Sequence, residues 1–178
     1  VWYFKAMISL EDRKLSDAEL AISEANRLRP KNADILSLLG DVYCEQNQQK
    51  FAIQYYQEAF ELSNNSFYLL KKGRSLFLFD QYKQAVKDVR YLYDHYLEEN
   101  KNNEEYIYYL LSCSYREIGD NEEAYNFARK LVDVSDSLEH KLHYAGILFL
   151  KSEDECENYL DTLNERYGNN KDFQQVYF

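Results

Sequence analysis

The chain has 178 residues, of which 46% are hydrophobic and 16% aromatic, and it contains one proline and five glycines. This composition excludes a disordered chain, because the apolar residues suffice for a core, and it allows long uninterrupted helices. The formal net charge of -10 argues against a general binder of nucleic acids or anionic membranes and favours a basic or neutral partner surface.

Small residues recur along the chain at a nearly constant spacing. They stand at Ala6, Gly40, Gly73, Ser112 and Gly146. A period of this length, which is about that of the tandem helical repeats, is typical of units that cannot bury their apolar faces alone and therefore stack on their neighbours. The sequence thus predicts an all-α fold, a right-handed α-solenoid of stacked antiparallel helix pairs.

The period divides the chain into about five helix pairs within one solenoid over 1–178. In chain order we expect them at 1–32, 33–65, 66–104, 105–138 and 139–167, followed by a partial helix at 171–178. Val1 is not an initiator Met, and the tail with Phe173, Val176, Tyr177 and Phe178 has no polar outer face, so it is a poor cap. We therefore expect a fragment of a longer chain.

Further residue types return around each small position, most clearly in the second pair. There Leu36, Leu39, Gly40 and Tyr43 precede Ala52, Tyr56 and Ala59. This spacing resembles the tetratricopeptide repeat (TPR) family, and the resemblance covers nearly the whole chain and implies a TPR-like superhelix. Small residues mark where two helix backbones cross closely. The structural positions that we assign in this way are Trp2, Ala6, Ala18, Ala25, Leu39, Gly40, Tyr43, Ala52, Ala59, Gly73, Ala85, Ser112, Ala124, Gly146 and Cys156.

The resemblance also implies a binding groove, because the first helix of each pair lines the concave surface in this family. Its partner-facing positions lie six and three residues before the small residue, and one and four residues after it. On this chain they mix aromatic, aliphatic and charged side chains, and aromatic residues and arginine contribute most to binding in protein interfaces. The predicted groove residues are Tyr3, Met7, Asp41, Cys44, Leu70, Arg74, Phe77, Tyr106, Tyr109, Cys113, Arg116, His140, His143 and Ile147.

The third pair is basic although the whole chain is acidic. Arg74 and Arg116 fall on predicted groove positions, with His143 beyond, so a carboxylate of a partner is one expected ligand for them. The alternative is internal, because Asp41 occupies the position equivalent to Arg74 in the preceding pair. We favour an ion pair between Asp41 and Arg74.

The longest of the spacings, from Gly73 to Ser112, places five extra residues near 100–104. The second helix of that pair is expected to continue through Tyr91 and Tyr96 and to protrude with a polar turn. This insertion is interpreted either as a side-on contact for a partner or as a neutral surface feature.

No catalytic, cofactor or metal site is expected. His140 and His143 share a helix face but lack a third ligand, and no phosphate-binding loop or nucleophile elbow is present. Cys44, Cys113 and Cys156 have no metal-type spacing, and stacked helices would hold the first two too far apart for a disulfide. Free thiols suggest a reducing compartment, so we expect a cytoplasmic protein.

The sequence therefore predicts a non-catalytic protein-protein interaction module or scaffold that holds an extended or helical peptide segment of another protein in a concave groove. No nucleic acid and no direct membrane insertion are expected, since no stretch reaches the roughly 20 apolar residues that a membrane helix needs. Four alternatives stay open: the substrate-recognition arm of a larger enzyme such as a glycosyltransferase, a peptide-binding chaperone of the secretion type, self-association through open repeat ends, and a groove filled by the protein's own segment.

Overall fold

The structure, a computed structural model, describes residues 1–177, without the side chains of Asp172, Val176 and Tyr177. Over this range the regular elements are the α-helices α1 to α11 and one 3₁₀ segment, with no β-strand. The predicted all-α fold of consecutively packed helices is confirmed. The helices form two compact units, Val1–Asn100 (unit 1) and Lys101–Phe178 (unit 2). The division of the chain into five repeats of one solenoid stays a prediction.

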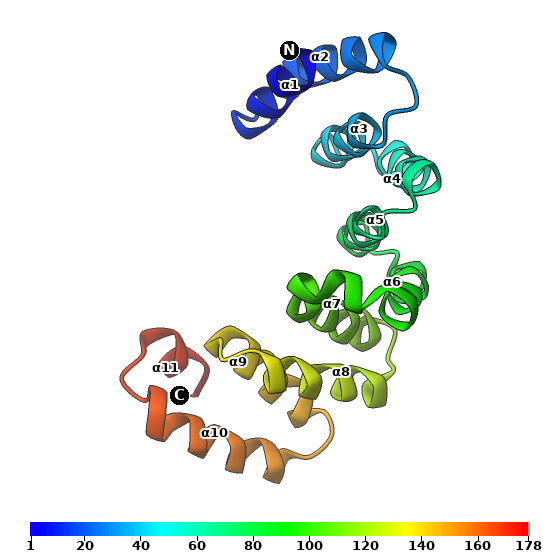
Figure 1. Cartoon of the computed structure of the whole chain (residues 1–178). Coiled ribbons are helices and arrows are strands. Elements are labelled where there is room, and N and C mark those ends of the chain that lie inside the picture. Colours follow the sequence, from blue (N-terminus) through cyan, green and yellow to red (C-terminus); the bar gives the residue numbers. More distant parts are fainter. Residues whose placement is uncertain (178) are drawn as a thin grey trace. The chain divides into compact units, whose positions relative to one another are not determined.

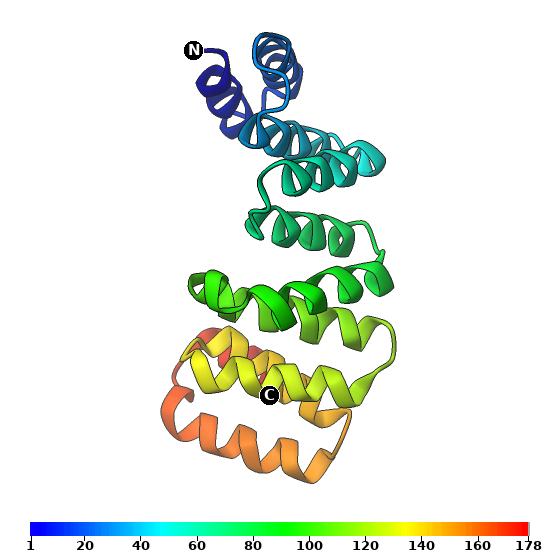
Figure 2. The ribbon, with the colours of Figure 1, turned by 45° about the vertical axis from the view of Figure 1, so that its right-hand side comes forward.

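Unit 1 contains three helix pairs. They are α1 (Trp2–Glu11) with α2 (Leu15–Leu28), α3 (Ala33–Glu45) with α4 (Gln49–Ser63), and α5 (Phe67–Leu78) with α6 (Tyr82–Tyr96). Each helix packs on the next one along the chain, and Figure 2 shows the pairs stacked from blue to green. Figure 1 places α3 and α5 on one side of this stack and α4 and α6 on the other. The first helices of successive pairs therefore form one wall of the unit.

Predicted small residues lie at the crossings within these pairs. Ala6 of α1 and Ala18 of α2 are both fully buried. Gly40 faces Tyr56, and a Cβ at residue 40 would lie only 2.7 Å from Tyr56 Cε1. The Tyr56 ring is itself buried, and its hydroxyl donates to Asp41 Oδ1 at 2.7 Å. Gly40 is thus the position at which α3 and α4 leave no room for a side chain.

Four turns inside helix pairs share one backbone conformation. A residue with positive φ follows the first helix at Arg13 (57°), Asn47 (58°), Asp80 (59°) and Gly119 (82°). The next amide returns to a carbonyl five residues earlier, as in the hydrogen bond of 2.8 Å from Lys14 N to Ser9 O. Such left-handed helix ends satisfy carbonyl groups that the helix leaves unpaired. The repeat period of the sequence therefore also sets the positions of the turns.

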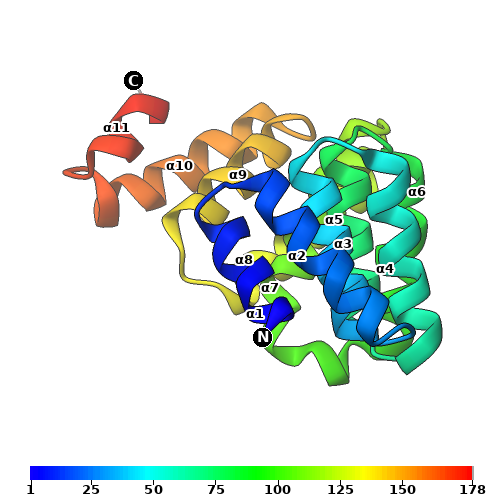
Figure 3. The same ribbon diagram turned by 90° about the horizontal axis from the view of Figure 1, so that it is seen from above.

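Unit 2 begins with the fourth pair, α7 (Glu104–Glu117) and α8 (Asn121–Val134). Its crossing lies at Ser112 and Ala124, which are fully buried, and Ser112 Oγ donates to Ala124 O at 2.9 Å. The fifth pair, α9 (Leu138–Phe149) and α10 (Glu153–Tyr167), follows, and α9 packs on both α8 and α10. The view in Figure 3 separates α10 from the short last helix, α11 (Lys171–Tyr177).

The close crossing of the fifth pair is not at Gly146, and the prediction for this residue was wrong. Gly146 is exposed, and a Cβ there would have no atom within 4 Å. Ala145 is buried instead, and its carbonyl accepts from Cys156 Sγ at 3.2 Å. Cys156 follows Ala145 at a distance one residue shorter than that from Gly40 to its partner position Ala52. The shorter turn moves the crossing by one residue.

Trp2 also departs from its predicted structural role. Its side chain remains 39% exposed, and Lys5 Nζ lies 5.3 Å from the centre of its ring. The equivalent residue of the second pair, Leu36, is buried, because α3 has the first pair to pack against. Trp2 belongs to the edge of unit 1 rather than to its core.

The insertion after α6 corrects the prediction in part, because α6 continues through Tyr96 as expected but the extra residues add no further turn of α-helix. α6 ends at Tyr96, and a kinked 3₁₀ segment, η1 (Glu98–Asn103), follows it. Asn100 within this segment is buried, and its Nδ2 donates to Ser66 Oγ at 2.7 Å and to Tyr96 O at 2.9 Å. The extra residues are therefore used to tie the end of α6 to the start of α5.

The end of the chain packs back on unit 2. α11 contacts both α9 and α10, and Phe173 is fully buried. The expected poor cap is wrong for Phe173, because its ring inserts into the core rather than facing solvent. The side chains of Val176 and Tyr177 and the whole of Phe178, which belonged to the same prediction, lie outside the described residues.

Candidate functional site

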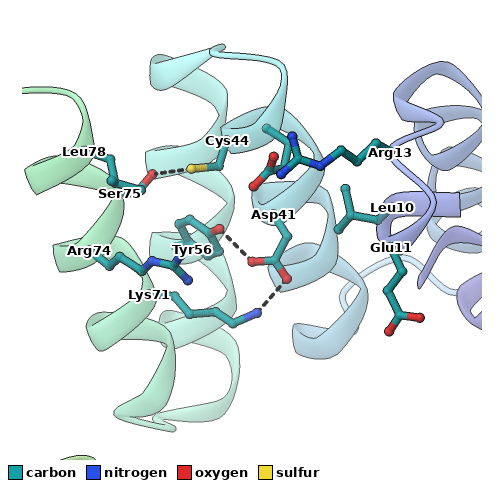
Figure 4. Close-up of a pocket in the computed structure, with 11 residues that line it drawn as sticks. Leu10, Glu11, Arg13, Asp41, Cys44, Tyr56, Lys71, Arg74, Ser75 and Leu78 are labelled. Atoms are coloured by element: carbon teal, nitrogen blue, oxygen red, sulfur yellow. Dashed lines mark hydrogen bonds and ion pairs between the residues drawn. The ribbon is translucent and has the colours of Figure 1, made fainter. Parts of the chain in front are cut away.

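A pocket of about 390 Å³ opens on the wall that the first helices of unit 1 share. Figure 4 shows α1 with its following turn on one side of it and α5 on the other, with Asp41 of α3 and Tyr56 of α4 between them. The lining residues are Leu10, Glu11, Arg13, Asp41, Cys44, Glu45, Tyr56, Lys71, Arg74, Ser75 and Leu78. The pocket combines aliphatic walls with both signs of charge.

Its floor is a fixed network centred on Asp41. Asp41 accepts from the Tyr56 hydroxyl at 2.7 Å and from Lys71 Nζ at 2.6 Å, and Lys71 also donates to Ser37 Oγ at 3.2 Å. The side chains of Lys71 and Asp41 are largely withdrawn from solvent, at 26% and 27% exposed. Burial, and next the Asp41 carboxylate, raise the pKa of Tyr56, so its hydroxyl stays a donor. Lys71 and Asp41 thus neutralise each other inside the pocket.

Arg74 is not the partner of Asp41, and that prediction was wrong. Lys71 takes this place because it lies three residues earlier on α5 and reaches the Asp41 carboxylate across the gap between α3 and α5. Arg74 is exposed and makes no ion pair or hydrogen bond with the described residues. Its neighbour one turn along, Leu78, is also exposed. The pocket therefore presents a free guanidinium beside an aliphatic side chain.

The other predicted groove residues of unit 1 divide into two groups. Tyr3, Met7, Cys44 and Phe77 are half-buried, so part of each side chain stays accessible. Leu70 is buried in the core and cannot meet a partner, which corrects its assignment. Position alone did not distinguish the groups, because successive residues are only about 100° apart around a helix and adjacent faces blend into one another.

In α7 of unit 2, the predicted groove residues are again only partly available. Tyr106 is exposed, Tyr109 is half-buried, and Arg116 is exposed while its Nη2 lies 2.8 Å from Glu117 Oε1. Cys113 is buried, which is a correction, and burial raises the pKa of its thiol. A buried neutral thiol is a packing residue rather than a contact for a ligand.

In α9 the shifted crossing changes the surroundings of the predicted groove residues His140, His143 and Ile147. His143 Nε2 lies 2.9 Å from Ser112 Oγ, whose own proton goes to Ala124 O, so Nε2 carries a hydrogen and donates. Burial first, and then the charges of Arg116 and His140, lower the pKa of His143 to about 4. His140 Nδ1 lies 2.7 Å from Ser135 Oγ, and Ile147 is buried. Ile147 is therefore corrected, whereas His140 and His143 are half-buried and their assignment to the groove stays a prediction.

With Ala145 as the crossing residue, the positions three before, one after and four after it are Leu142, Gly146 and Phe149. Leu142 is half-buried, while Gly146 and Phe149 are exposed. The separation from Cys156 along the sequence is the signal that identifies them. Counted from Ala145 it is one residue shorter than the separation between Gly40 and Ala52 in the second pair, and counted from Gly146 it is shorter still. The Tyr56–Asp41–Lys71 network gave no comparable signal in the sequence.

Two kinds of feature, metal-ligand clusters and membrane-spanning helices, are not found among residues 1–177. Over residues 1–177 no group of three or more His, Cys, Asp or Glu side chains is placed to hold a metal ion. None of the described helices is both long enough and apolar enough to cross a bilayer. Cys44, Cys113 and Cys156 are free thiols, and the reducing compartment expected from them stays a prediction.

Comparison with known proteins places two segments in one family. Residues 33–66 and 105–137 match the tetratricopeptide repeat, whereas no curated protein matches the chain significantly. Among solved structures, residues 41 to the end of MamA from Desulfovibrio magneticus RS-1 give a TM-score of 0.81 at 16% identity, over 96% of this chain and 95% of that chain.

Two further solved structures are similar over almost the whole chain. A tetratricopeptide repeat protein from Parabacteroides merdae ATCC 43184 gives a TM-score of 0.80 at 20% identity, over 99% of this chain and 69% of that chain. PilF from Pseudomonas aeruginosa gives 0.76 at 15% identity, over 99% of this chain and 85% of that chain. At such identities the likeness shows the fold alone.

Proposed function

We propose that this chain, a tetratricopeptide-repeat protein by its two matching segments, is a non-catalytic interaction module that holds a peptide segment of another protein. Repeat folds of this kind serve as scaffolds because their stacked helices form extended surfaces. The observation that carries the proposal is the pocket of about 390 Å³ on the first-helix wall of unit 1, with Arg74 free at its side.

The fixed floor of this pocket favours binding over catalysis. Lys71 and Asp41 are held by each other and by Tyr56 and Ser37. Among the described lining residues, no pair of groups is arranged as a nucleophile with its base. A further hydrogen bond between lining side chains joins Ser75 Oγ to Cys44 Sγ at 3.3 Å. These groups give shape and rigidity, so little side-chain freedom is lost when a ligand binds.

The free side chains indicate which kind of segment fits. Arg74 offers a planar set of donors that matches a carboxylate, and Leu10 and Leu78 offer aliphatic contact. The opposite side of the pocket carries Glu11 and Arg13, so its charge is balanced there. A segment with one acidic residue between apolar residues is the ligand that this arrangement favours, with the acid directed toward α5.

The first-helix wall of unit 2 is a second binding surface within the same proposal. It consists of Tyr106, Tyr109 and Arg116 of α7 with Leu142, Gly146 and Phe149 of α9. Unit 2 contains 16 acidic and 8 basic residues, whereas unit 1 contains 15 and 13. Because the long-range field favours ligands of opposite charge, unit 2 is expected to prefer more basic segments than unit 1.

The test is selection of random peptides displayed on phage against the purified chain. Enriched peptides are then synthesised with a fluorescent label, and their affinities are measured by anisotropy for the wild type and for Arg74→Glu. We expect acidic and apolar residues in the enriched peptides and a loss of affinity of about 10-fold or more in Arg74→Glu, because the contact becomes repulsive.

Lys83→Glu is the matched control, since Lys83 is an exposed cation on α6 away from the pocket. It changes the net charge equally and should leave the affinity within about 2-fold, apart from long-range screening. Enriched peptides that bind Arg74→Glu and the wild type equally would exclude this pocket. A selection that enriches no peptide would count against the function itself.

A further inference from the structure

A groove opens on the wall that the second helices of unit 1 share, away from the pocket that contains Arg74. We call it the lateral groove, and its volume is about 530 Å³. Helices α4, α5 and α6 contribute to its lining, which includes Gln57, Phe60, Leu69, Lys72, Lys87 and Tyr91. The wall runs along the stack of helix pairs and not across its end (Figure 2). The lateral groove is therefore not a face on which a further helix pair would stack.

Most charged groups of the lateral groove are neutralised in pairs. Lys72 Nζ lies 2.8 Å from Asp88 Oδ2, and Arg90 Nε lies 3.1 Å from Asp94 Oδ1. Lys87 is exposed on α6 and makes no ion pair or hydrogen bond with the described residues. The rim of the groove therefore carries one positive charge that the described chain leaves without a carboxylate.

Tyr91 supplies an exposed aromatic side chain beside this charge. It is 45% exposed, and its ring centre lies 4.3 Å from that of His95 and 6.0 Å from that of Tyr96. The His95 ring is itself held, because its Nδ1 donates to Tyr91 O at 2.9 Å. These neighbours restrict the Tyr91 side chain before any ligand binds, so little side-chain freedom is lost on binding. Tyrosine is also among the residue types that contribute most to protein interfaces.

The packing of the repeats does not require an aromatic residue at this position. Tyr91 lies six residues after Ala85, the fully buried small residue of α6. The residues that lie six after the corresponding small residues of the other four pairs are all polar, and they are Glu24, Glu58, Lys130 and Thr162. A glutamate thus satisfies the same position in two neighbouring pairs of unit 1, and the fold alone does not explain the Tyr91 ring.

We propose that the lateral groove docks an amphipathic helix of a partner protein, which places an apolar side chain against Tyr91 and a carboxylate on Lys87. Lys87 and Tyr91 are four residues apart on α6, or about 6 Å along the helix axis. A helix that lies along α6 presents its own residues at this spacing one turn apart. An acidic and an apolar residue on one face of that helix therefore meet Lys87 and Tyr91 at the same time.

The shape and charge of the lateral groove define this ligand further. A groove between two helices is a common binding place for the apolar face of a third. The formal net charge of the chain is -10, so a highly acidic helix is repelled at long range, and one acidic residue suits the single charge of Lys87. None of the residues that line the lateral groove lines the pocket with Arg74. The docking of this helix is therefore separate from the peptide binding proposed for that pocket.

The test is a phage library of a small helical bundle with one helix face randomised, selected against the chain with Arg74→Glu. This bait disables the pocket with Arg74, so the selection reports on other surfaces. We expect enriched helices with an acidic and an apolar residue one turn apart. Their affinity, measured by fluorescence anisotropy, should fall by about 10-fold or more in Tyr91→Glu, because the ring is lost and Lys87 gains a carboxylate of its own chain one turn away.

Tyr91→Glu is suited to this test because Glu24 and Glu58 occupy the equivalent positions of the first two pairs, and circular dichroism checks that the variant is folded. Leu62→Glu is the matched control. Leu62 is also 45% exposed and lies at the end of α4, but it does not line the lateral groove. The affinity of the enriched helices for this variant should stay within about 2-fold of that for the wild type.

Lys87→Gln tests the charged contact by itself. It should weaken an enriched helix by about 2- to 5-fold, and it should have no effect once the acidic residue of that helix is replaced by its amide.

Three results would overturn the proposal. They are a selection that enriches no helix, enriched helices that bind Tyr91→Glu as tightly as the wild type, and enriched helices that lose as much affinity in Leu62→Glu. Sedimentation equilibrium addresses another occupant, because self-association that Tyr91→Glu abolishes would assign the groove to a second copy of the chain and overturn the proposal too. Peptide binding in the pocket with Arg74 is measured with its own labelled peptides, so neither proposal depends on the outcome of the other.

Discussion

The second and fifth helix pairs carry the same kind of sequence pattern and pack differently. In the second pair, Gly40 leaves no room beside the Tyr56 ring. In the fifth pair, Gly146 is in open space, and Ala145 makes the close contact with Cys156. A glycine within the repeat pattern therefore does not locate a helix crossing on its own. The length of the turn between the two helices decides which residue lies there.

A shift of one residue has consequences for a whole helix face. Successive residues are about 100° apart around a helix, so moving the crossing from Gly146 to Ala145 rotates every assignment on α9 by that angle. Ile147 leaves the predicted groove for the core and His143 bonds to Ser112 of the neighbouring pair, while Gly146 is exposed. Experiments on these residues test whether the two pairs pack in these different ways.

The largest expected effect is the pH dependence of His143. In the unfolded chain the imidazole takes up a proton near its ordinary pKa of 6.5, but in the folded chain only near 4. Between these values the unfolded state binds more protons, so the free energy of unfolding decreases as the pH falls from about 6.5 to 4. The full contribution is roughly 3 kcal/mol, reached at about pH 4. Urea unfolding of the wild type across this range measures it.

His143→Gln isolates that effect from the other acid-titrating groups. The glutamine amide retains a donor for Ser112 Oγ but does not titrate. The groups that face His143 are Tyr109, His140 and Arg116, and all three are unchanged in the variant. The difference in stability between wild type and variant should therefore shift in favour of the variant at low pH. Parallel pH profiles would mean that the His143 imidazole is solvated in the folded chain.

The next effect is the overpacking of the second pair by Gly40→Ala. The new Cβ would lie 2.7 and 2.8 Å from two carbons of the Tyr56 ring, which cannot swing away without losing its hydrogen bond to Asp41. We expect a loss of about 2 kcal/mol in the free energy of unfolding of unit 1. Equilibrium urea unfolding followed by circular dichroism gives the value. A neutral result would show that Tyr56 is not held in place.

The matched change in the fifth pair, Gly146→Ala, is expected to have the opposite sign. No atom lies within 4 Å of the new Cβ, and the residue is inside α9, where alanine is a better helix former than glycine. We expect a gain of about 0.5 to 1 kcal/mol. The same unfolding measurement applies. Destabilisation here would restore Gly146 as a crossing residue and remove the contrast between the two pairs.

Most of the fold could be predicted from the sequence, because the same residue spacing recurs in successive helix pairs. Ala6, Gly40 and Ser112 lie at crossings as predicted, since each has a small partner on the second helix at the same distance along the chain. The candidate site was less accessible, because a groove position and a buried position differ by one residue in a helix. Lys71 illustrates this limit. It forms the ion pair with Asp41 that was expected for Arg74, because its side chain is long enough to reach the carboxylate. The spacing of residues in the sequence does not encode this reach.

Arg13→Gly tests the conformation of the turn inside a helix pair, which differs between the first four pairs and the fifth. Arg13 has φ of 57°, a conformation that costs a residue with a Cβ about 1 to 2 kcal/mol, whereas the turn before α10 passes through Ser152 with φ of -159°. Glycine removes this strain but loses more backbone entropy on folding, so the net gain in the free energy of unfolding should be about 0.5 kcal/mol.

Ser152→Gly should instead destabilise unit 2 by a few tenths of a kcal/mol, because Ser152 caps α10 by accepting from Glu155 N. Thermal unfolding of both variants measures the two signs, and equal signs would mean that the turn of the fifth pair belongs to the same class as the others.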